Sequence, residues 1–273
     1  MTLQLEHVGF RYPGSSRLVL DDLSCAFDPG KVSVIVGPNA AGKTTLLRIL
    51  AGVAVLKSGI ARLDDQNLRT IKARERAKRI AYMAQRPTLA AGFTVAQTLA
   101  LGRYALGPDP GSIERAMKRT EIDEMAEQGF HTLSAGQQQR VMLARALAQL
   151  DPWGAKRGSN PSRFLIADEP TSAMDPRHSI MTASLLQELT TLGIGVVVSL
   201  HDLTAAVRLA DRAVVLGAAG KVAASGDVSQ TLVPDILEPI YGVPFVVTPT
   251  PVGSVVTPVA LDVPLDHDTE VPE

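Results

Sequence analysis

The chain has 273 residues and a mass of 29.0 kDa, and its composition is 45% hydrophobic, 20% charged and 4% aromatic. This composition is ordinary for a globular α/β protein and excludes collagen-like, mucin-like and wholly disordered classes. Its 27 basic and 28 acidic side chains nearly cancel, so no strong overall field favours nucleic acid or anionic lipid. The single cysteine, Cys25, cannot form a disulfide within the chain, which is typical of a reducing compartment.

The first segments of the chain predict antiparallel strands. The start, MTLQLEHVGFRYPG, lacks a basic region followed by an apolar stretch, so it is unlike a secretory signal and we expect a cytosolic protein. The runs LQLEHV and VLDDLSCAF alternate imperfectly between apolar and polar residues, which indicates two strands. Pro13 and Gly14 predict a turn between them.

Four apolar runs later in the chain predict a buried sheet. They lie at 32–36, 164–167, 195–200 and 212–216. Uninterrupted apolar runs of this length are typical of strands covered on both faces. A helix-like segment follows each of the first three runs, so we expect a mainly parallel sheet with right-handed crossovers, and hence an α/β fold.

The segment from about 87 to 150 has helical periodicity and no convincing strand, which predicts a helical subdomain inserted into the sheet domain. The next segment, 151–162, is rich in Gly, Pro and Ser and predicts an exposed loop. The acidic end of the chain, 262–273, is expected to be frayed and dispensable for the function of the folded part.

An uncharged stretch between Glu238 and Asp262 has the length of a membrane span. Each proline in it removes a backbone donor that hydrocarbon cannot replace, so short β segments and turns are predicted instead of a membrane helix. The prolines are Pro239, Pro244, Pro249, Pro251 and Pro258.

A phosphate-binding motif follows the run 32–36 directly. GPNAAGKTT matches the pattern G-x-x-x-x-G-K-[ST] and precedes the helix-like segment TLLRILAG. Its backbone N–H groups and the helix N-terminus suit the phosphates of a nucleotide. We expect Lys43 to reach the β and γ phosphates and Thr44 to bind Mg²⁺. The predicted nucleotide-binding residues here are Gly37, Pro38, Asn39, Ala40, Ala41, Gly42, Lys43, Thr44 and Thr45.

Two acids end the second apolar run, in the segment FLIADEP. Strand alternation sends the side chains of Asp168 and Glu169 in different directions. Asp168 is then placed to face the metal ion, directly or through water. Glu169 is placed to polarise the water that attacks the γ-phosphate, as a general base.

The segment LSAGQ, residues 133–137, precedes a predicted helix with Ser134 as its N-cap. With the phosphate loop and the two acids, it makes residues 1 to about 240 resemble the ATP-binding cassette (ABC) ATPases, whose signature motif is LSGGQ. Ala135 replaces the usual first glycine and Gly136 is retained. The resemblance implies that Ser134, Ala135, Gly136 and Gln137 contact ATP held by a partner subunit.

The same resemblance assigns residues outside these motifs. Tyr12 matches an aromatic residue that stacks on adenine, and Gln85 matches a glutamine that senses the γ-phosphate and Mg²⁺. Asp175 matches an aspartate at the dimer interface, and His201 matches a histidine that contacts the γ-phosphate. Glu169, His201 and Gln85 are therefore the implied catalytic residues. The implied magnesium site is formed by Thr44, Gln85 and Asp168. His7, His131, His178 and His267 match nothing in the family pattern and are interpreted as ordinary residues.

The resemblance further implies an architecture and partners. It places an ABC ATPase domain at 1–240, with an antiparallel N-terminal β subdomain, a RecA-like core and the inserted helices. Short β segments and the acidic tail remain at 241–273. The family forms head-to-tail homodimers that use Mg²⁺ with ATP. They rest on a membrane permease at the cytoplasmic face of the inner membrane, with a periplasmic binding protein as an indirect partner and no nucleic acid.

The segment FTVAQTLALGRYAL, residues 93–106, resembles ATPases of iron-chelate, heme and vitamin B12 importers. The long gap between the signature and the acids resembles that of heme-import ATPases, so the resemblance implies heme as the substrate, with a siderophore or cobalamin importer as the alternative. A soluble ABC ATPase acting on DNA or ribosomes is disfavoured, because the chain has no long coiled coil and no second cassette. A P-loop kinase is also disfavoured, because LSAGQ and His201 would have no role in it.

Overall fold

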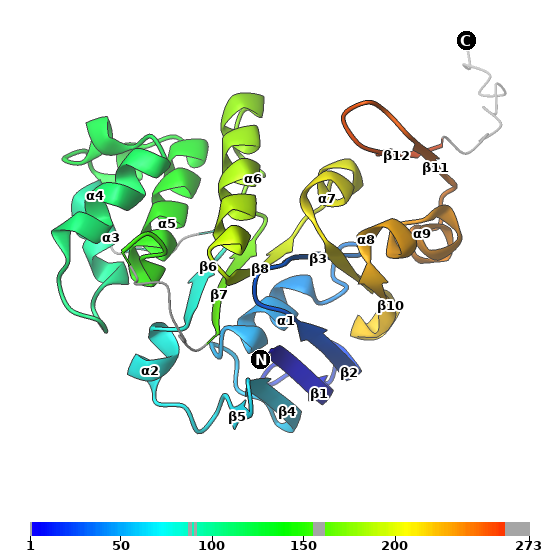
Figure 1. Cartoon of the computed structure of the whole chain (residues 1–273). Helices are drawn as coiled ribbons and strands as arrows, with labels where there is room; N and C mark the ends of the chain where they lie inside the picture. The colour runs from blue at the N-terminus through cyan, green and yellow to red at the C-terminus, as the bar shows by residue number, and fades with distance from the viewer. Residues whose placement is uncertain (1, 87–88, 90–91, 155–161, 260–273) are drawn as a thin grey trace, which may run out of the picture.

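In the computed structural model, which describes residues 2–86, 89, 92–154 and 162–259, an antiparallel sheet comes first in the chain (Figure 1). Strand β1 (Leu3–Phe10) pairs with β2 (Leu20–Phe27) on one side and β4 (Ser58–Leu63) on the other. β5 (Gln66–Asn67) completes the order β2-β1-β4-β5. The predicted antiparallel pair is confirmed, while β4 and β5 were not predicted.

A central sheet of six strands in the order β10-β9-β3-β8-β7-β6 forms the second layer. All neighbouring strands in it are parallel except β10, which pairs antiparallel with β9. The four predicted apolar strands are confirmed, and β6 and β10 extend the sheet at its two edges. The strands are β3 (Val32–Val36), β6 (Ile80–Met83), β7 (Arg163–Asp168), β8 (Ile194–Ser199), β9 (Arg212–Leu216) and β10 (Val222–Asp227).

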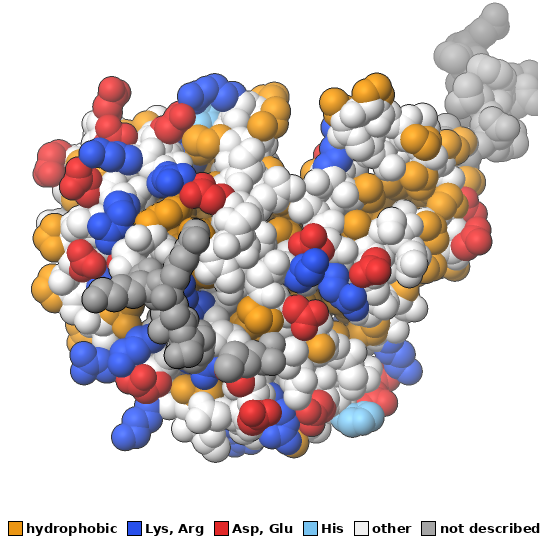
Figure 2. Space-filling model, in the orientation of Figure 1, with side chains coloured by type: hydrophobic (Ala, Val, Ile, Leu, Met, Phe, Trp, Pro, Cys, Tyr) orange, Lys and Arg blue, Asp and Glu red, His pale blue; other side chains and the backbone are white. Residues whose placement is uncertain are grey.

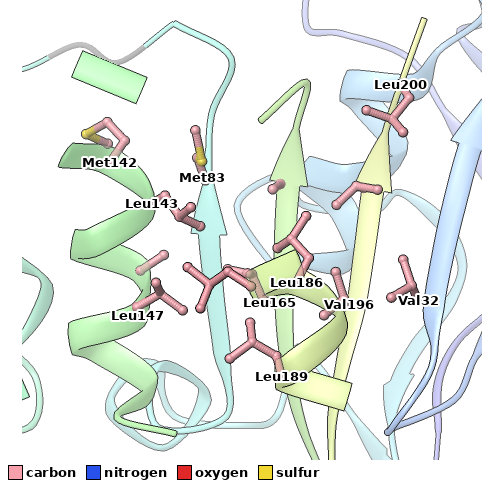
Figure 3. Close-up of a cluster of buried hydrophobic side chains, with 14 of the residues drawn as sticks. Val32, Met83, Met142, Leu143, Leu147, Leu165, Leu186, Leu189, Val196 and Leu200 are labelled. Carbon is pink, nitrogen blue, oxygen red and sulfur yellow. The ribbon is translucent and has the colours of Figure 1, made fainter. Parts of the chain in front are cut away.

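Strand alternation divides the central sheet between two hydrophobic cores. On β3, Val32, Val34 and Val36 face one core, and Ile35 faces the other. The first core lies under α5 (Ala135–Leu150), where Leu143 and Leu147 point toward β6 and β7 (Figure 3). The second core lies between the central sheet and the N-terminal sheet and contains α1 (Lys43–Leu50). Both faces are covered, which explains the uninterrupted apolar runs.

The remaining helices cover the first core and the edges of the sheet. α6 (Pro176–Thr191) and α7 (Leu203–Leu209) follow β7 and β8 in the chain and pack on the same face as α5. The short α2 (Ala73–Ala77) precedes β6 and contributes no buried side chain. Each of these connections returns the chain to a parallel strand, as expected for an α/β fold.

The inserted helical segment lies to one side of the sheet (Figure 1). It contains α3 (Val95–Gly102), α4 (Pro110–Arg119) and the long α5. Side-chain caps begin all three helices, because Thr94, Asp109 and Ser134 each accept a hydrogen bond from a backbone N–H three residues later. Within residues 92–150, β structure is limited to one isolated bridge, which agrees with the predicted helical insertion.

The predicted exposed loop at 151–162 is described only at its ends, and residues 155–161 lie outside the described part of the chain. Its beginning is packed rather than free. Trp153 donates a hydrogen bond from Nε1 to Glu188 of α6 at 3.0 Å, and the guanidinium of Arg119 lies 4.9 Å from the centre of its ring.

The C-terminal part contains α8 (Val228–Thr231), α9 (Pro234–Tyr241) and a hairpin of β11 (Phe245–Thr248) and β12 (Val255–Pro258). These short strands lie where short β segments were predicted, and among the described residues no helix is long and apolar enough to cross a membrane. The hairpin packs on α7, where Thr204 exchanges hydrogen bonds with the backbone of Val256. The acidic tail at 262–273, which was expected to be frayed, lies outside the described residues.

Candidate nucleotide site

The phosphate loop joins β3 to α1. Gly42 is the N-cap of α1 and has a φ of 100°, a conformation that L side chains rarely adopt. The loop wraps around the side chain of Lys43, whose Nζ donates to the carbonyl oxygens of Gly37 at 2.7 Å and Pro38 at 3.0 Å. Burial lowers the pKa of Lys43, while the carboxylates of Glu169 and Asp168 act in the opposite direction. The ammonium group is thus held inside a loop of backbone dipoles.

The two acids at the end of β7 have different surroundings. Asp168 is 1% exposed, and its Oδ1 accepts a 2.5 Å hydrogen bond from the hydroxyl of Ser199 on β8. Its Oδ2 is buried and has no hydrogen-bond partner within the described residues. Glu169 turns away with a φ of 50°, and its backbone N–H is held by Ser199. The two carboxylates therefore have different surroundings, and Glu169 is oriented by its left-handed backbone conformation just after β7 rather than by strand alternation.

Glu169 is the meeting point of the predicted catalytic residues. Gln85, in the segment after β6, donates from Nε2 to Glu169 Oε2 at 2.6 Å. His201, directly after β8, contacts the other carboxylate oxygen through its Nε2. The Glu169 side chain is 11% exposed and that of His201 is 48% exposed. The carboxyl ends of three neighbouring strands therefore bring these residues together, at the edge where parallel sheets bind ligands.

These residues line a cavity of about 500 Å³ beside the phosphate loop. Tyr12 lies at its rim, with its hydroxyl 3.1 Å from Thr45 Oγ1 and its ring edge-on to Phe10. The cavity is therefore lined by an aromatic ring, the phosphate loop, a cation and a carboxylate. Its lining includes Tyr12, Asn39, Ala40, Ala41, Gly42, Lys43, Thr44, Thr45, Gln85, Glu169 and His201, together with Ser15, Arg17, Leu18, Val19 and Ala219.

The LSAGQ segment lies elsewhere, at a second hollow of about 340 Å³. Ser134 and Gln137 form a capping box at the start of α5, with each side chain accepting from the backbone N–H of the other. Ala135, which replaces the usual glycine, is exposed. Asp175 caps α6 at the same hollow by accepting from the N–H of His178 at 3.0 Å. The residues predicted to bind ATP thus lie at two separate places on one chain.

Gly136 packs against backbone from the loop after β7, which makes it the more demanding of the two small residues. A Cβ at this position would lie 2.6 Å from the carbonyl oxygen of Ala173. We expect Gly136→Ala to displace the start of α5 and to lower ATPase activity by at least tenfold, because backbone cannot yield as a flexible side chain does. Ala135→Gly is the matched control and should stay within twofold in a steady-state phosphate-release assay. Equal activities of the two variants would contradict the assigned contact.

Two further residues were not singled out by the sequence. Gln139, on α5, donates from Nε2 to the carbonyl oxygen of Glu169 and accepts from the N–H of Ala173. It connects α5, the signature helix that begins at LSAGQ, to the segment that carries Glu169. Ser199 holds both Asp168 and the backbone of Glu169. No sequence motif marks either residue, because their hydrogen-bond partners lie about 30 residues away in the chain.

The residues predicted to bind Mg²⁺ fit that ion in chemistry. Thr44 and Gln85 line the cavity and each carries a side-chain oxygen, and Asp168 has a buried carboxylate oxygen without a partner among the described residues. Hard oxygen donors of this kind are what Mg²⁺ prefers. A buried carboxylate oxygen without a donor is costly unless a cation or water satisfies it.

A phosphate loop opening onto acids at the carboxyl ends of parallel strands is the arrangement of P-loop nucleoside triphosphatases. A family model described as ABC transporter matches residues 20–172. The hemin import ATP-binding protein HmuV of Bordetella parapertussis is 34% identical over 249 residues, covering 89% of this chain and 93% of its own. The protein of the same name from Rhodococcus jostii is 37% identical over 250 residues, covering 89% and 82%. The chain therefore belongs to the ABC transporter family, as an ATP-binding and ATP-hydrolysing member.

Solved structures agree with this fold. The dimeric structure of MJ0796, a bacterial ABC transporter cassette, matches with a TM-score of 0.70 and 26% identity, covering 84% of this chain and 99% of that one. An ATP-binding subunit of an ABC transporter matches with a TM-score of 0.72 and 23% identity, covering 89% and 94%. The second likeness concerns the fold alone.

Proposed function

We propose that this chain is the ATPase subunit of a heme importer. The observation that carries the proposal is the set of relatives named hemin import ATP-binding protein, which are 34–37% identical and match about nine-tenths of this chain. The segment at 93–106 supports the same substrate class. A siderophore or cobalamin importer is the alternative, because these chelates are served by ATPases of similar sequence.

We propose a head-to-tail homodimer as the active form. Lys43 and Glu169 line one hollow, and Ser134 and Gly136 line another. In the dimer, the hollow at Ser134 and Gly136 of each copy, the signature hollow, would lie opposite the phosphate loop of the other copy. Two complete ATP sites would result. The dimeric cassette among the similar structures supports this assembly. The boundaries of the ABC domain at 1–240 and of the C-terminal part at 241–273 belong to the same proposal.

Each predicted residue then has a distinct task. The phosphate loop and Lys43 bind the β and γ phosphates, and Tyr12 supports the adenine. Thr44, Gln85 and Asp168 would hold Mg²⁺, which supplies charge neutralisation on the phosphate oxygens when bound. Glu169 accepts a proton from the attacking water, and Gln85 and His201 hold its two carboxylate oxygens in place until the γ-phosphate arrives.

The permease is proposed to dock between the subdomains, near residues 85–103. Tyr104 follows this segment directly and is 91% exposed, and tyrosine is enriched at protein–protein interfaces. It borders a hollow of about 270 Å³ with Arg103 and Ile113. Docking at this end would place the subunit peripherally, at the cytoplasmic face of the inner membrane, with a periplasmic binding protein on the other side.

Growth on heme tests the substrate. Deleting the gene is expected to abolish growth with heme as the sole iron source and to spare growth on free iron. A plasmid copy of the chain should restore growth, and a Glu169→Gln copy should not, since transport needs hydrolysis. Unchanged growth on heme would contradict the proposal, and loss of growth on a ferric siderophore or of cobalamin uptake instead would establish the alternative.

The non-transport alternative predicts ATPase activity that depends on nucleic acid or ribosomes. On the face that Figure 2 shows, basic and acidic side chains are interspersed, which does not favour a polyanion. We expect added DNA or RNA to leave the ATPase rate unchanged. Stimulation by either would favour the soluble class.

A further inference from the structure

His178 lies on the first turn of α6 and is 19% exposed, although its neighbours there are open to solvent. Its Nδ1 is 2.6 Å from Asp175 Oδ2, while its backbone N–H donates to Asp175 Oδ1. Because a carboxylate only accepts hydrogen bonds, the ring must donate through Nδ1. Two donors from one residue thus hold both oxygens of the Asp175 carboxylate. They lower the pKa of Asp175 below its ordinary value, with the backbone hydrogen bond as the larger cause.

The other ring nitrogen faces a basic and an acidic neighbour. His178 Nε2 is 3.3 Å from Arg177 Nη1, which suits an acceptor when Nδ1 carries the proton. The same guanidinium pairs with both carboxylate oxygens of Glu121, at 2.7 and 2.9 Å. Glu121 Oε2 is 3.9 Å from His178 Nε2. The ring therefore connects Asp175 to a bidentate ion pair that crosses from α6 to the helical insertion.

Glu121 is joined in turn to the signature helix. It follows α4 with a φ of 52°, and its carbonyl oxygen accepts a 2.6 Å hydrogen bond from Arg140 of α5. Arg140 also binds the carbonyl oxygen of Thr120 and is 6% exposed. Arg140, Asp175 and His178 line the same hollow as Ser134. One chain of contacts thus runs from the signature helix through Glu121 and Arg177 to His178 and Asp175.

We infer that His178 is a positioning residue that orients Asp175 at the signature hollow and couples it, through Arg177 and Glu121, to the signature helix. This inference rests on the proposed head-to-tail dimer, in which Asp175 meets the partner subunit. A carboxylate that is 56% exposed would otherwise sample several rotamers. Fixing it before the partner arrives reduces the ordering cost of assembly.

The test uses full-length chains that also carry Glu169→Gln, so that bound ATP persists. Dimerisation is measured with MgATP by sedimentation across a range of protein concentrations. His178→Leu removes both ring nitrogens, and we expect the dimer dissociation constant to rise about tenfold, because hydrogen bonds to charged groups are lost. His178→Asn keeps an amide donor near the Nδ1 position and should stay within about threefold of the parent. His178→Gln places its amide near Nε2 and should resemble the Leu variant.

Two controls separate this role from folding. Monomer affinity for a fluorescent ATP analogue should be unchanged in every His178 variant, because the ring lies outside the phosphate-loop cavity. Asp22→Asn neutralises a more exposed His–Asp pair, His7 Nδ1 to Asp22 Oδ1 at 2.8 Å on the N-terminal sheet, and should leave dimerisation unchanged. Parent-like dimerisation of His178→Leu, or an Asn variant as weak as Leu, would overturn the inference. A parent that stays monomeric with MgATP would instead overturn the proposed dimer.

Discussion

Glu169→Gln is expected to slow ATP hydrolysis by about 10²- to 10⁴-fold, because the amide keeps the shape of the side chain and loses the proton acceptor. Gln85 donates to one oxygen of Glu169, and His201 contacts the other. The introduced amide offers one acceptor oxygen in place of two, so the contact with either Gln85 or His201 weakens. We therefore expect no rearrangement of these residues that restores the rate. Single-turnover hydrolysis of bound ATP measures the chemical step directly.

The same variant should accumulate as an ATP-bound dimer, since ATP then bridges two chains without being consumed. Size-exclusion chromatography with and without MgATP shows this as an earlier elution. Glu114→Gln is the matched control, because Glu114 pairs with Lys118 on the exposed face of α4, away from the cavity. A monomer under both conditions, or hydrolysis at the parent rate, would refute the head-to-tail site or the assignment of Glu169.

Lys43→Ala is expected to weaken ATP binding by about 10²-fold, since it removes the charge-assisted hydrogen bonds to phosphate. In the structure the ammonium group donates to the carbonyl oxygens of Gly37 and Pro38. Lys43 as a whole is 7% exposed. The loop therefore loses its internal support as well as its cation. Equilibrium titration with a fluorescent ATP analogue gives the dissociation constant.

Lys31→Ala provides the comparison for Lys43. Lys31 is exposed and lies 4.0 Å from Asp211, so its removal changes the net charge equally and touches no part of the cavity. Its ATP affinity should match that of the parent. An unchanged affinity of Lys43→Ala would show that backbone N–H groups alone hold the phosphates.

The sequence predicted those strands of which one face or both faces are buried against apolar neighbours. The strands at 32–36 and 212–216 were visible because both faces of the central sheet are covered. Strand β6 was not visible, since IAYM is short and follows a run of charged residues around α2. Strand β10 alternates, but its residues VAASGD are mostly small, so the alternation carries little hydrophobic contrast.

Some residues of the candidate site could be predicted from the sequence and others could not. Lys43, Asp168 and Glu169 were predictable because their chemistry requires particular residue types next to one another in the chain. Ser199 was not, although its hydroxyl holds Asp168 across 31 residues of sequence. His178 was interpreted as ordinary, since nothing local distinguishes it and its partners come from the end of α4 as well as from α6. Contacts between distant segments leave no periodic mark in a single sequence.

The long helix α5 is fastened near both ends to parts with different tasks. Gln139 binds the carbonyl oxygen of Glu169, while Ala148 accepts a 3.2 Å hydrogen bond from Arg103 beside the exposed Tyr104. Roughly 14 Å of helix separates these two attachments, at about 1.5 Å per residue. A hydrogen-bonded helix resists shortening, so we expect a displacement of Arg103 to be transmitted along α5 to the backbone of Glu169.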